Sequence, residues 1–195
     1  MAKTNSIYLV LDMENDLVHA DGPNGKAGYS DQVQGRGIVE KTRRAIDKAR
    51  AAGVPIGFVR VGFSPDYREC PPNSPIFSGA RKNGIFKLGE WGTETHPDLG
   101  QQPTDFDIIK HRVSPFYSTN LEAILRANGI SRIYCSGVST NAVVQALVRE
   151  GHDRDYEMIV LEDCCAGLTK EEHDYAVAGL QRFCRMTNSE EVAFE

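Results

Sequence analysis

Short, uninterrupted apolar runs, separated by segments of helical periodicity, constrain the fold of this chain most strongly. Five such runs are rich in strand-forming residues, and they occupy positions 7–11, 55–61, 106–110, 131–136 and 156–161. A run that is apolar throughout is typical of a strand buried on both faces of a parallel sheet. With a shorter strand expected around 184–186, the sequence predicts a mainly parallel sheet of about six strands.

Helical patterns lie between most of these runs. In the first, 38–52, one face collects Ile38, Thr42, Ala45, Ile46 and Ala49. Gly53 is expected to end this helix. Further helices are expected at 118–127, 141–151 and 169–181, the last opened by a capping box. Strands alternating with helices predict a single Rossmann-like α/β domain over residues 1–195, in three layers with helices on both faces of the sheet.

Two long stretches lack regular periodicity. Residues 14–37 are polar and glycine-rich, and we interpret them as a functional loop because they are too long for a simple turn. Residues 62–104 hold six of the nine prolines and the only tryptophan. Long irregular segments of this kind usually cover a site or form an interface, so we expect one of these roles for 62–104.

Composition and charge narrow the classes of partner. The length of 195 residues suits one domain with a sizeable core. The formal net charge of −5 gives no electrostatic reason to expect a nucleic-acid or anionic membrane partner. No apolar run reaches the roughly 18 residues of a transmembrane helix, and the first residues lack the apolar core of a signal peptide. We therefore expect a cytoplasmic protein.

Three chemically useful positions fall at the carboxyl ends of predicted strands. Asp12 follows the first strand, Lys110 closes the third, and the turn 137–143 follows the fourth. Ligands of parallel α/β sheets bind outside these strand ends, where the strand order reverses. A strand that leads directly into a helix also offers free N–H groups to a negative oxygen. From the residues alone, Asp12 could equally be a turn residue and Lys110 a surface lysine.

An Asp–Lys pair at this edge of the sheet would have a defined chemistry. Lys110 closes an apolar strand, so its ammonium would emerge from a dry environment. Burial lowers the pKa of a lysine, whereas a nearby carboxylate keeps the lysine charged. Such a pair can position a proton and stabilise developing negative charge.

The turn after the fourth predicted strand reads Gly137-Val138-Ser139-Thr140-Asn141-Ala142-Val143-Val144. It resembles the isochorismatase-like hydrolases, also called the cysteine hydrolase superfamily. Members of this superfamily typically read Gly-Val-x-Thr-Asn-x-Cys-Val here, with the Cys as nucleophile. Similar segments follow the other strands, at 11–16, 62–67, 110–116 and 161–166, so the resemblance covers most of the chain. It implies a hydrolase that acts on a small molecule.

The resemblance also implies roles for individual residues. Asp12 would orient or deprotonate the attacking group, and Lys110 would be its electrostatic partner. The peptide bond between Val138 and Ser139 would be cis, and the backbone N–H groups of Ser139 and Val143 would form the oxyanion hole. Because these donors belong to the main chain, they survive a change of side chain at position 143.

Position 143 departs from the family pattern, because Val143 stands where the nucleophilic Cys is expected. A Val side chain cannot attack a carbonyl, so covalent catalysis through this position is excluded. The true isochorismatases cleave a vinyl ether with the Asp as general acid and need no thiol. That chemistry remains open here, whereas amide hydrolysis by the usual thiol route does not. The alternative is a non-catalytic relative that serves as a small-molecule binding or assembly module.

Other nucleophiles are less favoured by the sequence. Cys135 lies inside the fourth predicted strand and is expected in the core. Cys164 and Cys165 end the fifth strand and could lie near the site. Ser139 and Thr140 are nearer in sequence, but no histidine stands in a motif position to activate either of them.

Histidine and cysteine spacing indicates no metal site. The nicotinamidases of the superfamily bind a metal through an Asp-x-His pair, whereas this chain reads Asp66-Tyr67-Arg68, and its later histidines are scattered. The five cysteines are odd in number and lack a C-x-x-C pair, which favours free thiols. Neither a dinucleotide fingerprint nor a P-loop follows the first strand. We expect no metal and no cofactor.

Two further expectations concern the surroundings of the site. Trp91, Tyr67 and Phe116 are candidates for substrate-binding residues, although each aromatic ring taken alone could be structural. Members of the resembling family form dimers or tetramers, so the resemblance implies a homodimer or homotetramer. The proline-rich segment 62–104 would suit such an interface.

Overall fold

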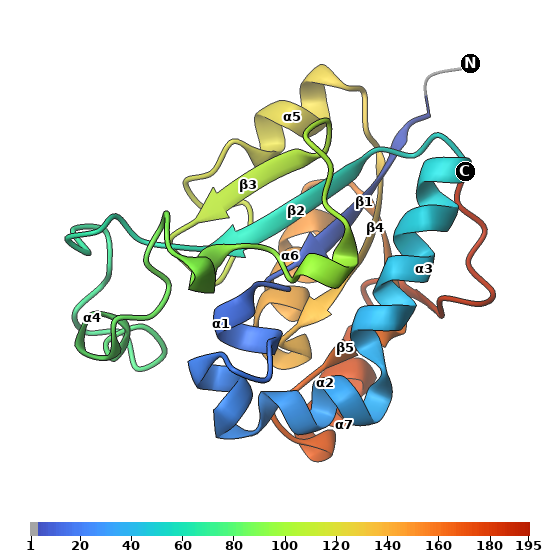
Figure 1. The fold of residues 1–195 in the computed structure, drawn as a ribbon. Helices are drawn as coiled ribbons and strands as arrows, with labels where there is room; N and C mark the ends of the chain where they lie inside the picture. Colours follow the sequence, from blue (N-terminus) through green and yellow to red (C-terminus); the bar gives the residue numbers. More distant parts are fainter. Residues whose placement is uncertain (1–3) are drawn as a thin grey trace.

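Six parallel strands form one sheet in the computed structural model, which describes residues 4–195 (Figure 1). Their order across the sheet is β3-β2-β1-β4-β5-β6, and every neighbouring pair is parallel. The strands are β1 (Ser6–Leu11), β2 (Ile56–Val61), β3 (Phe106–Lys110), β4 (Arg132–Val138), β5 (Glu157–Ala166) and β6 (Arg185–Thr187). The predicted α/β fold with a parallel sheet of six strands is therefore confirmed.

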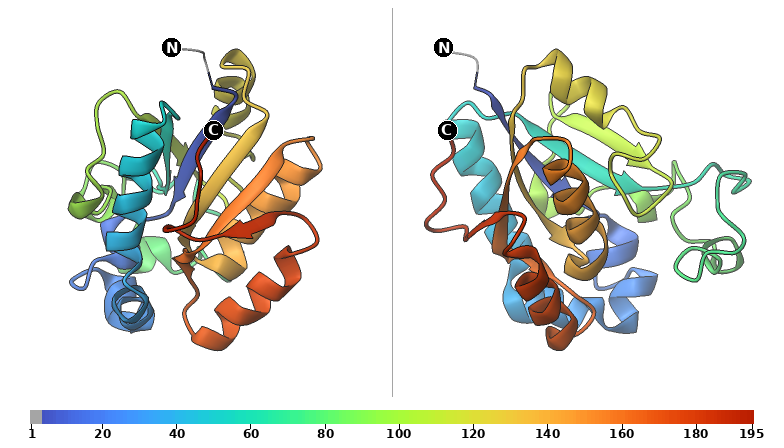
Figure 2. Two further views of the ribbon diagram at one scale, coloured as in Figure 1. Left: turned by 90° about the vertical axis from the view of Figure 1, so that its right-hand side faces the viewer. Right: turned by 180° about the vertical axis from the view of Figure 1, so that it is seen from behind.

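Helices cover both faces of this sheet (Figure 2). The helices of the described residues are α1 (Asn15–Val18), α2 (Ser30–Arg36), α3 (Ile38–Ala51), α4 (Ala80–Asn83), α5 (Leu121–Ala127), α6 (Gln145–His152) and α7 (Lys170–Leu180). Short 3₁₀ turns span Trp91–Thr93 and Pro97–Leu99, and π turns span Gly25–Tyr29 and Thr140–Val144. The layer on one face contains α3, and the layer on the other contains α5 and α6.

The central strand β1 supplies side chains to both cores, which explains why its sequence is apolar throughout. Ile7 and Leu9 pack in the core that lies under α5 and α6. Tyr8 and Val10 point to the opposite face and pack in the core under α3. Because successive side chains of a strand alternate between faces, a strand covered on both sides needs apolar residues at every position.

The predicted face of α3 is the buried one. Its five buried residues are Ile38, Thr42, Ala45, Ile46 and Ala49, as the helical periodicity indicates. Gly37 precedes the helix with a left-handed φ of 62°, and Ala52 forms its C-cap, so Gly53 lies just beyond the end. Local periodicity identifies this helix because a single apolar stripe meets the sheet.

The interpretation of residues 14–37 as a loop is wrong, because much of this segment is helical. It contains α1, the π turn and α2, each too short to display a full apolar stripe. Val18 and Val33 anchor the segment in the core under α3. Tertiary packing rather than periodicity therefore stabilises these turns. By contrast, 62–104 is largely irregular, as expected, and Figure 1 shows the part around α4 projecting away from the sheet.

Strand β5 is longer than its apolar run indicates. It continues beyond Leu161 to Ala166, and Cys165 pairs with Gly137 of β4 after a register shift. The five cysteines are unpaired thiols, as expected. Within the part of the chain that the structure describes, no helix is long and apolar enough to cross a membrane.

Candidate active site

The strand order reverses between β1 and β4, and two of the predicted site segments lie at this point. In the paired register Leu11 lies beside Gly137, so Asp12 and the turn after β4 emerge next to each other. Connections diverge to opposite faces at such a switch point, which leaves a crevice at the carboxyl ends of the strands. The topology therefore brings together residues that are more than 120 positions apart.

Gly137 allows the close approach of β4 to the end of β1. Its φ is 140°, and a Cβ atom at this position would lie 2.0 Å from the carbonyl oxygen of Leu11. No side chain fits at that distance, because the obstacle is rigid main chain. Glycine at this position therefore allows the turn that follows it to stand directly beside Asp12.

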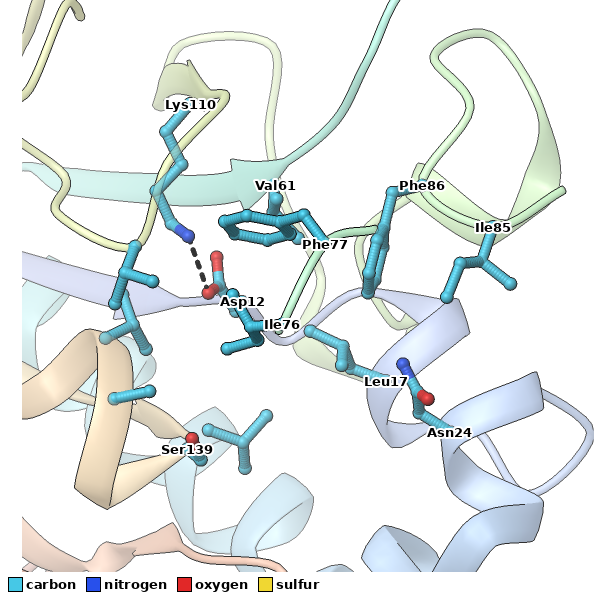
Figure 3. A pocket seen from close by; sticks show the side chains of 14 residues that line it. Asp12, Leu17, Asn24, Val61, Ile76, Phe77, Ile85, Phe86, Lys110 and Ser139 are labelled. Atoms are coloured by element: carbon cyan, nitrogen blue, oxygen red, sulfur yellow. Dashed lines mark ion pairs between the residues drawn. The ribbon is translucent and has the colours of Figure 1, made fainter. Parts of the chain in front are cut away.

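Asp12 and Lys110 form a buried ion pair across the sheet (Figure 3). Lys110 ends β3 and reaches past β2, so that its Nζ lies 2.9 Å from Oδ2 of Asp12. The side chains are only 2% and 7% exposed, respectively. The ammonium also donates to the carbonyl of Arg112 at 3.1 Å. Asp12 has a left-handed φ of 53°, a conformation that Asp tolerates better than most residues.

Burial and the lysine act in opposite directions on the carboxyl of Asp12. Desolvation raises its pKa above the ordinary value, and the adjacent Lys110 ammonium lowers it, with burial the larger effect. Only Oδ2 is engaged by the lysine, and Oδ1 has no hydrogen-bond partner among the described residues. A raised pKa makes this carboxylate a stronger proton acceptor than a solvated aspartate.

A cavity of about 190 Å³ adjoins this pair. Figure 3 shows Asp12 and Lys110 on one side of it and Ser139 on the other. Its walls are mainly apolar: Leu17, Val61, Ile76, Phe77, Ile85, Phe86, Val113, Val138, Ala142 and Val143. Asn24 adds a polar group near Leu17. Among the described lining residues the only charged groups are Asp12 and Lys110, so the charges of the lining cancel.

Five of the residues singled out from the sequence meet in this cavity. They are Asp12, Lys110, Val138, Ser139 and Val143. The peptide bond between Val138 and Ser139 is cis. The π turn that contains Val143 begins directly after Ser139, so both residues belong to one short turn facing the Asp12 carboxyl group.

The three aromatic residues suggested for substrate binding lie elsewhere. Tyr67 donates its hydroxyl to the carbonyl of Ile85 at 2.9 Å and packs on Phe63, outside the cavity lining. Phe116 stacks on Tyr156 in the core beneath α5. Trp91 is 46% exposed and is not among the residues that line the cavity. The rings of Tyr67 and Phe116 pack against other aromatic rings, which fits a structural role, whereas Trp91 contacts the ring of His19 and stays partly exposed.

Comparison with known proteins agrees with this geometry. The model of the family described as the isochorismatase domain matches residues 6–191. The chain belongs to the isochorismatase family. It is 32% identical to the isochorismatase family protein YecD of Escherichia coli O157:H7, over 98% of this chain and 95% of that protein. The chain is therefore a member of a family of hydrolases.

Relatives with more specific names belong to the same family. The ureidoacrylate amidohydrolase RutB of Methylorubrum extorquens is 32% identical, over 81% of this chain and 68% of that protein. The solved structure of N-carbamoylsarcosine amidase from Thermoplasma acidophilum has a TM-score of 0.75 and 26% identity, and covers 97% of this chain and 99% of that one. Both names describe the cleavage of amide-type bonds.

In this isochorismatase family member the native thiols do not replace the absent cysteine. None of the five cysteines is among the residues that line the cavity. Cys135 and Cys165 are fully buried in the core under α6, and Cys164 is buried on the opposite face. Burial raises the pKa of Cys165 to about 12 and that of Cys135 well above its usual range. These thiols stay protonated and unreactive at neutral pH.

Two residues of the 11–16 segment, which resembles the family, have a role that the sequence did not indicate. Asn15 donates its side-chain amide to the carbonyl of Trp91 at 2.9 Å. Asp16 accepts the backbone N–H of Phe86 at 2.6 Å, and Gly92 packs against its carboxyl group. These buried side chains hold the 84–92 segment, which supplies two cavity walls. The signal available was their position three and four residues after Asp12, in the segment that resembles the family.

The phenylalanine walls of the cavity were also not anticipated. Phe77 and Phe86 come from the irregular segment after β2, where no periodicity predicts which ring faces inward. Figure 3 shows the Phe77 ring directly beside Asp12.

As for metals, no group of three or more His, Cys, Asp or Glu side chains among residues 4–195 is arranged to hold an ion.

Glu14 is a buried carboxyl group next to the Asp12–Lys110 ion pair. It is 0% exposed, and neither of its carboxyl oxygens has a hydrogen-bond partner among the described residues. Burial raises its pKa well above the ordinary value of 4.5, and the charge of Asp12 adds to the effect. Because the folded protein holds this proton where the unfolded chain has released it, the free energy of unfolding falls as the pH rises above about 4.5.

Replacing Glu14 with Met is therefore expected to stabilise the protein at pH 8 by about 1–3 kcal/mol. The apolar side chain removes an unpaired buried carboxyl at nearly constant volume. Urea denaturation from pH 5 to pH 8 measures the difference, which should shrink toward pH 5. The exposed carboxylate of Glu171 on α7 provides the control, and E171Q should show no comparable trend. A loss of stability in E14M at pH 8 would contradict the prediction.

Proposed function

We propose that this protein hydrolyses a small, uncharged amide-type molecule by direct attack of water, with Asp12 as general base. The observation that carries the proposal is the buried Asp12–Lys110 pair, which adjoins a cavity closed on its other side by the 139–143 turn. The names of RutB and of N-carbamoylsarcosine amidase support amide hydrolysis rather than the vinyl-ether cleavage left open by the sequence.

The proposed reaction begins with a water molecule between Asp12 and the carbonyl carbon of the substrate. Ionised Asp12 accepts a proton from this water while the oxygen of the water bonds to the carbonyl carbon. The carbonyl oxygen becomes an oxyanion, which the backbone N–H groups of Ser139 and Val143 stabilise. Protonated Asp12 then gives the proton to the leaving nitrogen as the C–N bond breaks. The products are a carboxylic or carbamic acid and an amine or ammonia.

Lys110 has an electrostatic role in this scheme. Its ammonium lies on Oδ2 of Asp12 and favours the ionised carboxylate that the first step requires. The ammonium also donates to the carbonyl of Arg112, so two acceptors hold it beside Oδ2 of Asp12. The other carboxylate oxygen, Oδ1, has no hydrogen-bond partner among the described residues, and we assign the reacting water to it.

The charge of the cavity supports an uncharged substrate. Lys110 is the only cation among the described lining residues, and Asp12 already neutralises it. A substrate carboxylate inside this apolar space would lose its hydration without gaining a free cation. The volume of about 190 Å³ and the rings of Phe77 and Phe86 suit a compact apolar acyl group.

A panel of matched compounds tests the proposal. It contains apolar primary amides and N-carbamoyl compounds, each paired with an analogue that carries a carboxylate, and one vinyl ether. Ammonia release and mass spectrometry follow turnover. We expect kcat/KM for the uncharged member of a pair to exceed that of its partner by about tenfold or more. Preference for the charged analogues contradicts the substrate class, and conversion of the vinyl ether alone contradicts the amide reaction.

Val143 favours one second candidate, a non-catalytic protein that binds a small molecule or serves in assembly. The site keeps its cavity but lacks the side chain with which relatives of the superfamily attack. Thermal-shift screening followed by a turnover assay on every stabilising compound separates the two functions. Ligands that stabilise the protein and are never converted support the binding module, whereas conversion of any of them supports the hydrolase.

Replacing Val143 with Cys is expected to create a reactive thiol in the cavity. Because Val143 lines the same space as Asp12, iodoacetamide should alkylate V143C at least about tenfold faster than the buried native thiols. Mass spectrometry of tryptic peptides locates the modification and separates it from that of the half-buried Cys70.

The double variant V143C/D12N serves as control for this reaction. Its alkylation should be slower than that of V143C, because Asn cannot accept the thiol proton. If position 143 stays unmodified in V143C while Cys70 reacts, the cavity does not admit a small amide at this residue.

A further inference from the structure

A buried histidine behind the site connects α7 and β5 to the 139–143 turn. His173 of α7 is 1% exposed, and both of its ring nitrogens are engaged. Nδ1 lies 2.8 Å from Oγ1 of Thr140, and Nε2 lies 2.6 Å from Oε1 of Glu162 on β5. In the sequence no histidine stands in a motif position near Thr140, whereas in the structure His173, 33 residues away, is hydrogen-bonded to it.

The carboxylate of Glu162 determines the direction of these hydrogen bonds. Arg36 of α2 donates to Oε1 of Glu162 at 2.6 Å and to the carbonyl of Cys165 at 2.9 Å. Burial pushes the pKa of Glu162 up, but the hydrogen bonds from His173 and Arg36 outweigh it and lower the pKa. An ionised carboxylate only accepts, so Nε2 carries a proton. In the neutral ring Nδ1 then accepts from the Thr140 hydroxyl.

Thr140 is not placed to act as a nucleophile, although hydroxyl, imidazole and carboxylate stand in the order of a catalytic triad. Its side chain is 0% exposed and does not line the cavity. It lies between Ser139 and Val143, on the side of the turn that faces α7. The hydrogen bond between Thr140 and His173 therefore holds the turn on the side opposite the cavity.

We propose that His173 is a positioning residue, which holds Thr140 and so keeps the turn that contains Ser139 and Val143 in place beside Asp12. The cross-link joins α7 and β5 to a turn of only five residues, Thr140–Val144. Oxyanion stabilisation depends on donors held rigidly before the reaction begins. The consequence for catalysis rests on the proposed function, whereas the consequence for the rigidity of the turn does not.

Two substitutions of His173 separate its two hydrogen bonds. The amide of H173N occupies the place of Nδ1 and keeps the contact with Thr140, whereas that of H173Q occupies the place of Nε2 and keeps the contact with Glu162. Hydrogen–deuterium exchange of peptides covering 137–145 is the first readout. We expect exchange about tenfold faster in H173Q than in the wild type, and within about threefold of the wild type in H173N. Peptides from β1 serve as internal reference.

A matched pair at Thr140 gives the same test if a histidine variant does not fold. T140V removes the hydroxyl at constant shape and should accelerate exchange of the turn. T140S keeps a hydroxyl, so the exchange rate of its turn should lie close to that of the wild type. Equal exchange in H173N and H173Q, or in T140V and T140S, overturns the positioning role. Neither comparison requires a known substrate.

The kinetic readout uses whichever amide the compound panel identifies. We expect H173Q and T140V to lower kcat about tenfold with KM within about twofold, because donors to the oxyanion act in the transition state rather than in substrate binding. A raised KM with an unchanged kcat overturns the role in catalysis. If the wild type converts no compound, the proposed function fails, and the exchange experiment still decides whether His173 orders the turn.

Discussion

Replacing Asp12 with Asn is expected to lower kcat/KM for the substrate by about 10³-fold or more. The amide has the shape of the carboxyl group and can still contact Lys110, but it cannot accept a proton from water. The loss should appear in kcat, because the reacting water rather than the bound substrate depends on this oxygen. Steady-state kinetics on the amide identified by the compound panel measures the effect.

The matched control for this variant is D47N. Asp47 lies on the exposed side of α3 and pairs with Arg43, far from the cavity, so its kinetics should equal those of the wild type. Circular dichroism and thermal-shift binding confirm that D12N is folded and still binds the substrate. Residual activity within tenfold of the wild type in folded D12N would remove Asp12 from the role of general base.

Replacing Lys110 with Met should produce the largest loss of stability, about 3–5 kcal/mol at pH 7. The substitution leaves the carboxyl of Asp12 buried without its cation. Its pKa, already raised by burial, should rise further once the opposing effect of Lys110 is gone. The folded state then keeps a proton that the unfolded chain releases above the ordinary value of 3.8, so the deficit should grow with pH above that value.

Urea denaturation of K110M between pH 4 and pH 8 tests this prediction. The double variant D12N/K110M should recover part of the lost stability, because no unpaired charge remains in the cavity. K170M is the control, since Lys170 is exposed in an ion pair with Asp174 and should contribute less than about 1 kcal/mol. A deficit in K110M that does not change with pH would show that the lysine contributes packing rather than charge.

Several expectations from the sequence remain predictions. Self-association as a homodimer or homotetramer and a cytoplasmic location rest on the family and on composition. The roles of Asp12, Lys110, Ser139 and Val143 in catalysis are proposals supported by their convergence in one cavity. The experiments on D12N and K110M address the first two of these residues directly.

Strands and the long helix could be predicted from the sequence because their signal is local. β3 begins and ends where its apolar run does, and the buried face of α3 follows from its periodicity. The short helices between 14 and 37 could not be predicted, since one or two turns of helix do not display a stripe. The extension of β5 to Ala166 could not be predicted, because Glu162 and Asp163 interrupt the apolar run.

By itself, the sequence determined the α/β class, the family resemblance and the absence of a nucleophile at Val143. It also placed Asp12 and Lys110 at strand ends. Only the tertiary structure decided that Lys110 reaches across β2 to Asp12, that Phe77 and Phe86 form the cavity walls, and that His173 holds Thr140. Periodicity records which side of an element is buried. Contacts between distant segments depend instead on strand order and on buried hydrogen bonds that no local pattern encodes.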